Sequence, residues 1–306
     1  MHVAVYGAGA LGSVYGVRLA TRARADVSWI VRPSKVDVRD PIVIESVKKD
    51  LRESIDAPTR VADIPGDADV VLLAVGTDDI DAIRPVLDAR DIPIVVLTPM
   101  LPKDWDRMRT AFGGRLLCAM PNVVAYARKD DGVVRYWLPP APTRIDEPRR
   151  TGDIAVRELA RRLDEAGLRA HFELGVHEKN PATTVAWIPI AMAFAVAGSA
   201  EALAKDDSLL SLITRACREG ASLGSRIGAM EPWAALSPAI AAPWAMRAWL
   251  GLLPRVSPEA LFYAEEHFGR KLVTQHRAMI RDMIDLAKDK RVGHEALEEL
   301  ASRLQA

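Results

Sequence analysis

The sequence predicts an α/β domain built on a parallel sheet, followed by an all-α domain. Two observations carry this prediction. In the first half of the 306-residue chain, short apolar runs such as 69–75 and 92–98 alternate with segments of helical spacing. Uniformly apolar strands separated by helices indicate a parallel sheet covered on both faces. From about residue 176 onward strand signals vanish, and helical segments interrupted by prolines follow.

The elements of the first domain are expected in a regular order. A β-branched strand, HVAVY, is followed by a helix through SVYGVRLATRA and a second strand, VSWIV. Further strands are expected at 42–46, 59–63, 69–75, 92–98 and 115–121, with helices at 78–89 and from Trp105. The segment 123–145 predicts antiparallel strands that depart from the parallel order, with a turn at Asp130-Asp131-Gly132. An amphipathic helix at 153–167 and a last strand at 169–174 are expected to follow.

Five long helices are expected in the second half of the chain. Their predicted ranges are 180–204, 206–228, 237–250, 256–287 and 292–305. The sequence therefore predicts two domains, 1–175 and 176–306.

The composition excludes several classes of partner. Lys plus Arg equals Asp plus Glu at 41 each, so neither a nucleic acid nor an anionic membrane surface is an expected partner. The two cysteines, Cys118 and Cys217, fit a reducing compartment, and a first strand starting at residue 2 or 3 leaves no room for a signal peptide. These two features together predict a cytoplasmic protein. No metal site is expected, because the six histidines are scattered along the sequence.

The apolar segment 182–200 has nearly the length of a membrane span. It contains Pro189 and lacks the flanking aromatic and basic anchors that support insertion. A buried central helix of the all-α domain explains it better than a transmembrane helix.

The first strand leads into a glycine-rich turn, Gly7-Ala8-Gly9-Ala10-Leu11-Gly12. The strand, turn and helix order is the context that a dinucleotide-binding Rossmann turn requires. Gly7 is expected to make the tight turn, Gly9 to let the backbone approach a pyrophosphate, and Gly12 to bring helix and strand close together. A plain βα turn is the alternative.

The second strand ends in Arg32-Pro33-Ser34-Lys35, without an acidic residue. An acid at this place would accept hydrogen bonds from a ribose 2′-hydroxyl and repel a 2′-phosphate. Arg32 and Lys35 are instead suited to neutralise a 2′-phosphate, so NADP(H) is the expected cofactor. A solvated basic loop is the alternative.

The chain resembles the ketopantoate reductase (2-dehydropantoate 2-reductase) family as a divergent member. The resemblance is carried by VYGAGALGSVYG, by the arginine after strand two in VRPSK, and by the all-helical second domain. It implies NADPH-dependent hydride transfer to a small 2-keto acid or related carbonyl in a cleft between the domains. It also implies a lysine proton donor at the start of the helical domain, a role that falls to Lys179.

Further site residues follow from the same resemblance. Thr184 stands where the family has an asparagine. His177 and Asn180 lie close to Lys179 in the sequence and are alternative candidates for the same role. Thr98 replaces an asparagine after strand five as a donor near the cofactor. The family's late glutamate has no clear counterpart, and the nearest polar cluster contains Glu265, Glu266, His267 and Lys271, which alternatively form an ordinary amphipathic surface.

The positions at which this sequence differs from the family leave two other functions open. One is a dinucleotide-binding sensor or scaffold without catalysis, and the other is a dehydrogenase of another hydroxy compound. The segment 233–254, with three tryptophans and little charge, predicts a homodimer contact or a cleft lining, with an ordinary core as the alternative.

Overall fold

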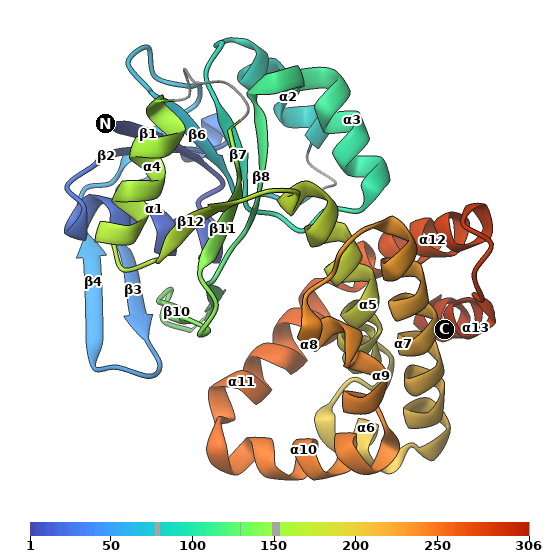
Figure 1. Cartoon of the computed structure of the whole chain (residues 1–306). Coiled ribbons are helices and arrows are strands. Elements are labelled where there is room, and N and C mark those ends of the chain that lie inside the picture. The colour runs from blue at the N-terminus through green and yellow to red at the C-terminus, as the bar shows by residue number, and fades with distance from the viewer. Residues whose placement is uncertain (77–79, 129, 149–153, 306) are drawn as a thin grey trace. The chain divides into compact units, whose positions relative to one another are not determined.

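The computed structural model of the chain describes residues 1–76, 80–128, 130–148 and 154–305 (Figure 1). The chain divides into two compact units. The N-terminal unit comprises Met1–Thr98 and Asp104–His177, and the helical unit comprises Pro99–Lys103 and Glu178–Ala306.

An eight-stranded sheet forms the centre of the N-terminal unit, in the order β12-β11-β8-β7-β6-β1-β2-β5. Its strands are β1 (His2–Tyr6), β2 (Asp26–Ile30), β5 (Thr59–Val61), β6 (Val70–Leu73), β7 (Ile94–Val96), β8 (Leu116–Met120), β11 (Thr143–Asp146) and β12 (Ala170–Glu173). The six strands from β8 to β5 are parallel, whereas β11 is antiparallel to β8 and parallel to β12. The predicted α/β fold with a parallel sheet is therefore confirmed.

A second sheet of four strands was not predicted. Its order is β4-β3-β10-β9, formed by β3 (Ile42–Ser46), β4 (Leu51–Ile55), β9 (Val124–Ala127) and β10 (Val134–Trp137). The expected strand at 42–46 thus leaves the main sheet. Strand β4 was missed because LRESI contains two charged residues and only one β-branched residue, which is a weak strand signal. The antiparallel pair β9–β10 is present as expected.

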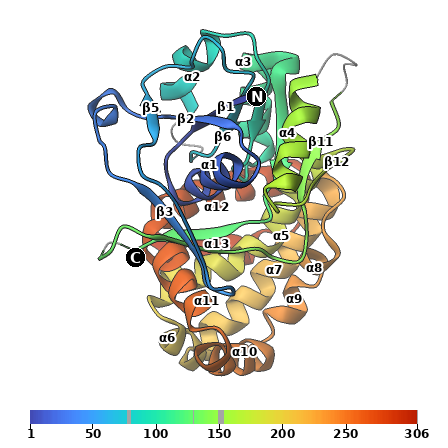
Figure 2. The same ribbon diagram turned by 90° about the vertical axis from the view of Figure 1, so that its left-hand side faces the viewer.

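Helix α1 (Ala10–Arg22) lies between the two sheets of the N-terminal unit (Figure 2). Two faces of α1 are therefore covered, and residues 12–19 are all buried. Arg18 lies in this core because its Nε donates to the Ala166 carbonyl at 2.7 Å and its Nη1 to the Tyr136 hydroxyl at 2.8 Å. The other helices of this unit are α2 (Ile80–Asp88), α3 (Pro102–Phe112), α4 (Ile154–Glu165) and the 3-10 helices η1 (Pro33–Lys35) and η3 (Gly113–Arg115).

In the described part of the helical unit, all regular structure is helical, which confirms the predicted all-α region. The elements are α5 (Val176–Ala197), α6 (Ala200–Lys205), α7 (Asp207–Ile227), α8 (Pro232–Ala235), α9 (Ser237–Ile240), α10 (Pro243–Val256), α11 (Pro258–Tyr263), the π-helix η4 (Ala264–Lys271), α12 (Val273–Asp289) and α13 (Glu295–Gln305). The expected helix 256–287 is divided into α11, η4 and α12, and the expected helix 237–250 is divided into α9 and α10.

One helix in the described residues, α5, is long and apolar enough to cross a membrane, and 72% of its most apolar window is buried inside the protein. Its side chains contribute to the apolar core of the helical unit, as expected for a central helix.

Large apolar side chains gather on the surface of α8, α9 and α10. These exposed residues, called the α8–α10 face below, are Trp233, Leu236, Ile240, Trp244, Trp249, Leu252 and Val256.

Candidate functional site

The glycine-rich turn follows β1 at the carboxyl edge of the parallel strands. Gly7 has φ +105°, and a Cβ there would lie 2.6 Å from the Ala74 carbonyl oxygen. A Cβ on Gly12 would lie 2.0 Å from the Gly7 carbonyl oxygen. Both positions therefore require glycine for a structural reason.

Gly9 differs from Gly7 and Gly12, the other two glycines of the motif. It precedes α1 with φ −76° and ψ −175°, a conformation open to any residue, and no atom lies within 4 Å of a Cβ built there. As a glycine, the N-cap residue has no side chain that could cap this helix end. The backbone N–H groups of the first helical turn have no partner within the helix, so they and the helix dipole favour an anion in the open space.

The segment after β2 carries the predicted basic residues. Arg32 precedes η1, which ends at Lys35, and both side chains are exposed. Among the described residues neither has an ion-pair partner. Their charges are thus available to an anion at this end of the sheet.

Thr98, the expected hydrogen-bond donor to the cofactor, makes its hydrogen bond within the protein. Its hydroxyl donates to the Val75 carbonyl, close to the carboxyl end of β6. A Cβ on the nearby Gly76 would meet nothing within 4 Å. Residues 77–79, which follow Gly76, lie outside the described residues.

A buried hydrogen-bond chain that the sequence did not indicate fixes α1 to the sheet. The Tyr15 hydroxyl lies 2.8 Å from Thr143 Oγ1, and Thr143 Oγ1 donates to Asn122 Oδ1 at 2.8 Å. Since the threonine hydroxyl has one proton, Tyr15 is the donor in the first bond. Burial raises the pKa of Tyr15, so the phenol stays protonated in this role.

Lys179 lies in the first turn of α5, which begins at Val176, earlier than predicted. Its Nζ is 3.6 Å from Glu231 Oε1, and the Glu231 side chain is 9% exposed. The Glu231 backbone N–H donates to Thr183 Oγ1 at 3.1 Å, which connects α5 with the start of α8. Sequence analysis missed Glu231 because 52 residues separate it from its partner; the glutamate before Pro232 was the available signal.

The neighbouring candidates Asn180 and Thr184 are buried. The Thr184 hydroxyl donates to Asn180 Oδ1 at 3.3 Å, one helical turn away. This bond orients the asparagine amide.

The late polar cluster lies on η4. Glu266 forms an ion pair with Arg270, and the His267 ring stacks on Tyr263 with centroids 4.7 Å apart. Burial lowers the pKa of His267 to about 4, so its imidazole is neutral near pH 7. Their role in substrate binding stays a prediction.

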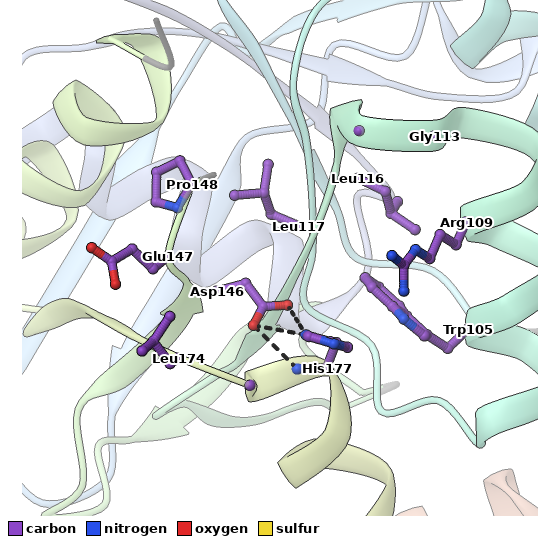
Figure 3. A pocket seen from close by; sticks show the side chains of 12 residues that line it. Trp105, Arg109, Gly113, Leu116, Leu117, Asp146, Glu147, Pro148, Leu174 and His177 are labelled. Carbon is purple, nitrogen blue, oxygen red and sulfur yellow. Dashed lines mark hydrogen bonds and ion pairs between the residues drawn. The ribbon is translucent and has the colours of Figure 1, made fainter. Parts of the chain in front are cut away.

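His177 belongs to the N-terminal unit, where it lines a cavity of about 360 Å³ (Figure 3). Its Nδ1 is 3.0 Å from Asp146 Oδ2, and its ring stacks on Trp105 with centroids 5.7 Å apart. Sequence analysis missed this arrangement because Asp146 and Trp105 come from β11 and α3.

The fold and the glycine turn together define the structural class, a protein whose N-terminal unit has a Rossmann-type parallel sheet and a glycine turn of the dinucleotide-binding type. Residues 3–136 match the family described as ketopantoate reductase PanE/ApbA. The N-terminal part of the chain is thus similar in sequence to the ketopantoate reductase family, in agreement with the resemblance carried by the glycine turn.

Solved structures agree with this assignment in fold. A 2-dehydropantoate 2-reductase from Geobacter metallireducens GS-15 has a TM-score of 0.74 at 20% identity, over 100% of this chain and 99% of its own. A dimeric ketopantoate reductase from Staphylococcus aureus has a TM-score of 0.69 at 14% identity, and the match covers 100% of this chain and 98% of the reductase. A D-mandelate dehydrogenase solved with NADH and anilino(oxo)acetate has a TM-score of 0.68 at 13% identity, and the match covers 100% of this chain and 97% of the dehydrogenase. No curated protein sequence matches the chain.

Proposed function

We propose that the protein is an NADP(H)-dependent reductase of a small 2-keto acid or related carbonyl compound. The observation that carries the proposal is the open space at Gly9, beside a helix end whose N–H groups have no side-chain cap. Arg32, which is exposed and has no ion-pair partner among the residues that the structure describes, supports the choice of NADP(H) over NAD(H).

The dinucleotide is expected to lie along the carboxyl edge of the parallel strands. The backbone N–H groups of Ala10, Leu11 and Gly12 would hold the pyrophosphate, with Ala8 and Gly9 leaving it room. Arg32 and Lys35 would bind the 2′-phosphate. Thr98 would contact the cofactor only if its hydroxyl turned away from the Val75 carbonyl.

The bound dinucleotide would supply the hydride. Reduction of a carbonyl leaves negative charge on its oxygen, so a proton donor is needed there. Lys179 is the proposed donor. Glu231 is the proposed positioning residue for its ammonium group, because their charged atoms lie 3.6 Å apart and Glu231 is nearly buried.

The experiment that tests this assignment compares Lys179→Ala, His177→Ala and Glu266→Ala. NADPH oxidation is followed with a panel of 2-keto acids, 2-keto lactones and aldehydes. Lys179→Ala should lower turnover by roughly 10²- to 10⁴-fold, the usual range for a lost general acid, with nearly unchanged NADPH affinity. Loss only in His177→Ala or Glu266→Ala would assign the proton donor elsewhere.

Glu231→Gln gives a second readout of the same site. A positioning role predicts lower kcat and a shifted pH profile for turnover, whereas a merely structural role would lower the melting temperature without moving the pH profile.

A sensor without catalysis remains the rival function. Tight NADPH binding with no turnover of any compound would favour that rival. Turnover only in the oxidative direction, on hydroxy acids, would instead favour a dehydrogenase, the activity named for the D-mandelate dehydrogenase of the same fold.

We infer a cytoplasmic location from the cysteines. Cys118 and Cys217 are both buried and free. Burial raises the pKa of Cys217 to about 12, so that thiol is held in its unreactive protonated form.

A further inference from the structure

Strand β5 lies beside β2 at one end of the main sheet (Figure 2). The last residues of both strands are in register with the last residue of β1, since Tyr6 pairs with Ile30 and Ile30 pairs with Val61. The Gly7 backbone N–H donates to the Ile30 carbonyl at 3.4 Å. The segment 32–40, called the η1 loop below, therefore starts beside the glycine turn at the carboxyl edge of the parallel strands.

The η1 loop is attached to β5 at both of its ends. Directly before the loop, the Val31 backbone N–H donates to the Val61 carbonyl at 2.9 Å. At its far end, Arg60 Nη1 donates to the Val38 carbonyl at 2.6 Å and Arg60 Nη2 donates to the Asp40 carbonyl at 2.8 Å. Two neighbouring residues of β5 thus hold both ends of the η1 loop.

Hydrogen bonds within the loop connect Arg60 with Arg32. The Val38 backbone N–H donates to the Lys35 carbonyl at 3.3 Å, and the Lys35 backbone N–H donates to the Arg32 carbonyl at 2.8 Å. Because Val38 also accepts from Arg60, an unbroken series of hydrogen bonds joins the guanidinium group to the backbone of Arg32.

The η1 loop has little packing of its own. Val36 and Val38 are half-buried, and the other residues of the loop are exposed. Segments with few buried apolar contacts open locally at a low cost in free energy. The planar guanidinium of Arg60, which reaches two carbonyls at once, therefore contributes a large share of what fixes the loop.

We infer that Arg60 is the positioning residue of the 2′-phosphate site. It holds the η1 loop so that Arg32 and Lys35 are in place before the phosphate arrives, and the phosphate then binds without the entropic cost of ordering the loop. NADH lacks the 2′-phosphate, so it gains nothing from this order. The inference rests on the proposed NADP(H)-dependent function.

Fluorescence titrations of Arg60→Gln with NADPH and NADH test the inference. The ratio of the two affinities should fall at least threefold relative to the wild type, because NADPH binding weakens while NADH binding stays the same. A merely structural role would lower the melting temperature without changing this ratio.

Arg169→Gln is the matched control. Arg169 precedes β12 at the opposite end of the sheet, and its Nη2 donates to the carbonyls of Pro139 at 2.6 Å and Ala141 at 3.3 Å. It therefore also holds a loop by two carbonyls, but far along the sheet from the η1 loop. Its replacement should lower the melting temperature about as much as Arg60→Gln and leave the NADPH to NADH ratio unchanged.

Arg60→Lys separates position from charge. Lysine keeps the positive charge but lacks the planar fork that spans two carbonyls. The positioning role predicts that Arg60→Lys loses the preference for NADPH as Arg60→Gln does. A normal preference in Arg60→Lys would mean that charge alone matters, and would overturn the inference.

Amide hydrogen exchange gives a readout that needs no cofactor. The amides of Lys35 and Val38 should exchange at least tenfold faster in Arg60→Gln than in the wild type. The inference is overturned if their exchange accelerates less than this, if the affinity ratio falls less than threefold, or if Arg169→Gln lowers the ratio equally. In each of these cases a wild-type preference for NADPH would leave the proposed function standing, whereas a wild type without that preference would overturn the NADP(H) assignment itself.

Discussion

Replacing Gly9 by valine should separate dinucleotide binding from folding. The backbone at Gly9 has φ −76°, and no atom lies within 4 Å of a Cβ there, so valine is accommodated without a clash. The fold should lose about 1 kcal/mol, because valine is a poorer residue than glycine before a helix. The melting temperature should fall by no more than about 4 °C.

The same valine would occupy the space expected for the pyrophosphate. Loss of two charge-assisted hydrogen bonds, each worth about 1.5–3 kcal/mol, should weaken NADPH binding at least 100-fold. Fluorescence titration of NADPH and a thermal melt measure the two effects. Gly12→Val is the matched contrast, because its Cβ would lie 2.0 Å from the Gly7 carbonyl oxygen and should destabilise the fold by roughly 3 kcal/mol or more.

The reasoning about the turn is refuted if folded Gly9→Val protein binds NADPH within threefold of the wild type, a difference of only about 0.7 kcal/mol. Normal melting of Gly12→Val would contradict the packing argument alone.

Three further predictions concern cofactor choice, acid stability and association. NADPH should bind at least tenfold more tightly than NADH in fluorescence titrations, about 1.4 kcal/mol, and Arg32→Gln should remove most of that preference. Burial lowers the pKa of His276 to about 4, below its unfolded value near 6.5. As the pH falls, the unfolded state therefore binds a proton first, and the free energy of unfolding should decrease by up to ~3 kcal/mol between pH 6.5 and 4. Replacing the histidine, in His276→Phe, should reduce this loss in denaturant titrations. The α8–α10 face should form a homodimer contact, and Trp244→Glu should shift the protein toward monomer in sedimentation velocity, because Trp244 is 75% exposed.

Each of these three predictions has a contradicting outcome. Equal affinities for NADPH and NADH would remove the assigned role of Arg32. Acid unfolding that His276→Phe leaves unchanged would mean that other groups set the pH dependence. A wild-type protein that stays monomeric at high concentration would exclude the homodimer.

The local part of the fold and site could be predicted from the sequence. The glycine turn was predictable because Gly7, Gly9 and Gly12 follow a β-branched strand directly, and each glycine acts within its own βα unit. Apolar periodicity likewise predicted the order of strands and helices. These signals depend on neighbours along the chain.

The long-range part could not be predicted. The second sheet requires β3 to pair with β10, some 90 residues later, and no local pattern encodes that pairing. The contacts of Lys179 with Glu231 and of His177 with Asp146 likewise join distant segments. Such contacts depend on topology, which residue spacing alone does not specify.

A crystal structure of the protein with NADP⁺ tests the central claim most directly. The account predicts the pyrophosphate within hydrogen-bond distance, about 3 Å, of the backbone N–H groups that follow Gly9, and the 2′-phosphate within the same distance of Arg32. A dinucleotide bound elsewhere, or a 2′-phosphate turned away from Arg32 toward solvent, would contradict it.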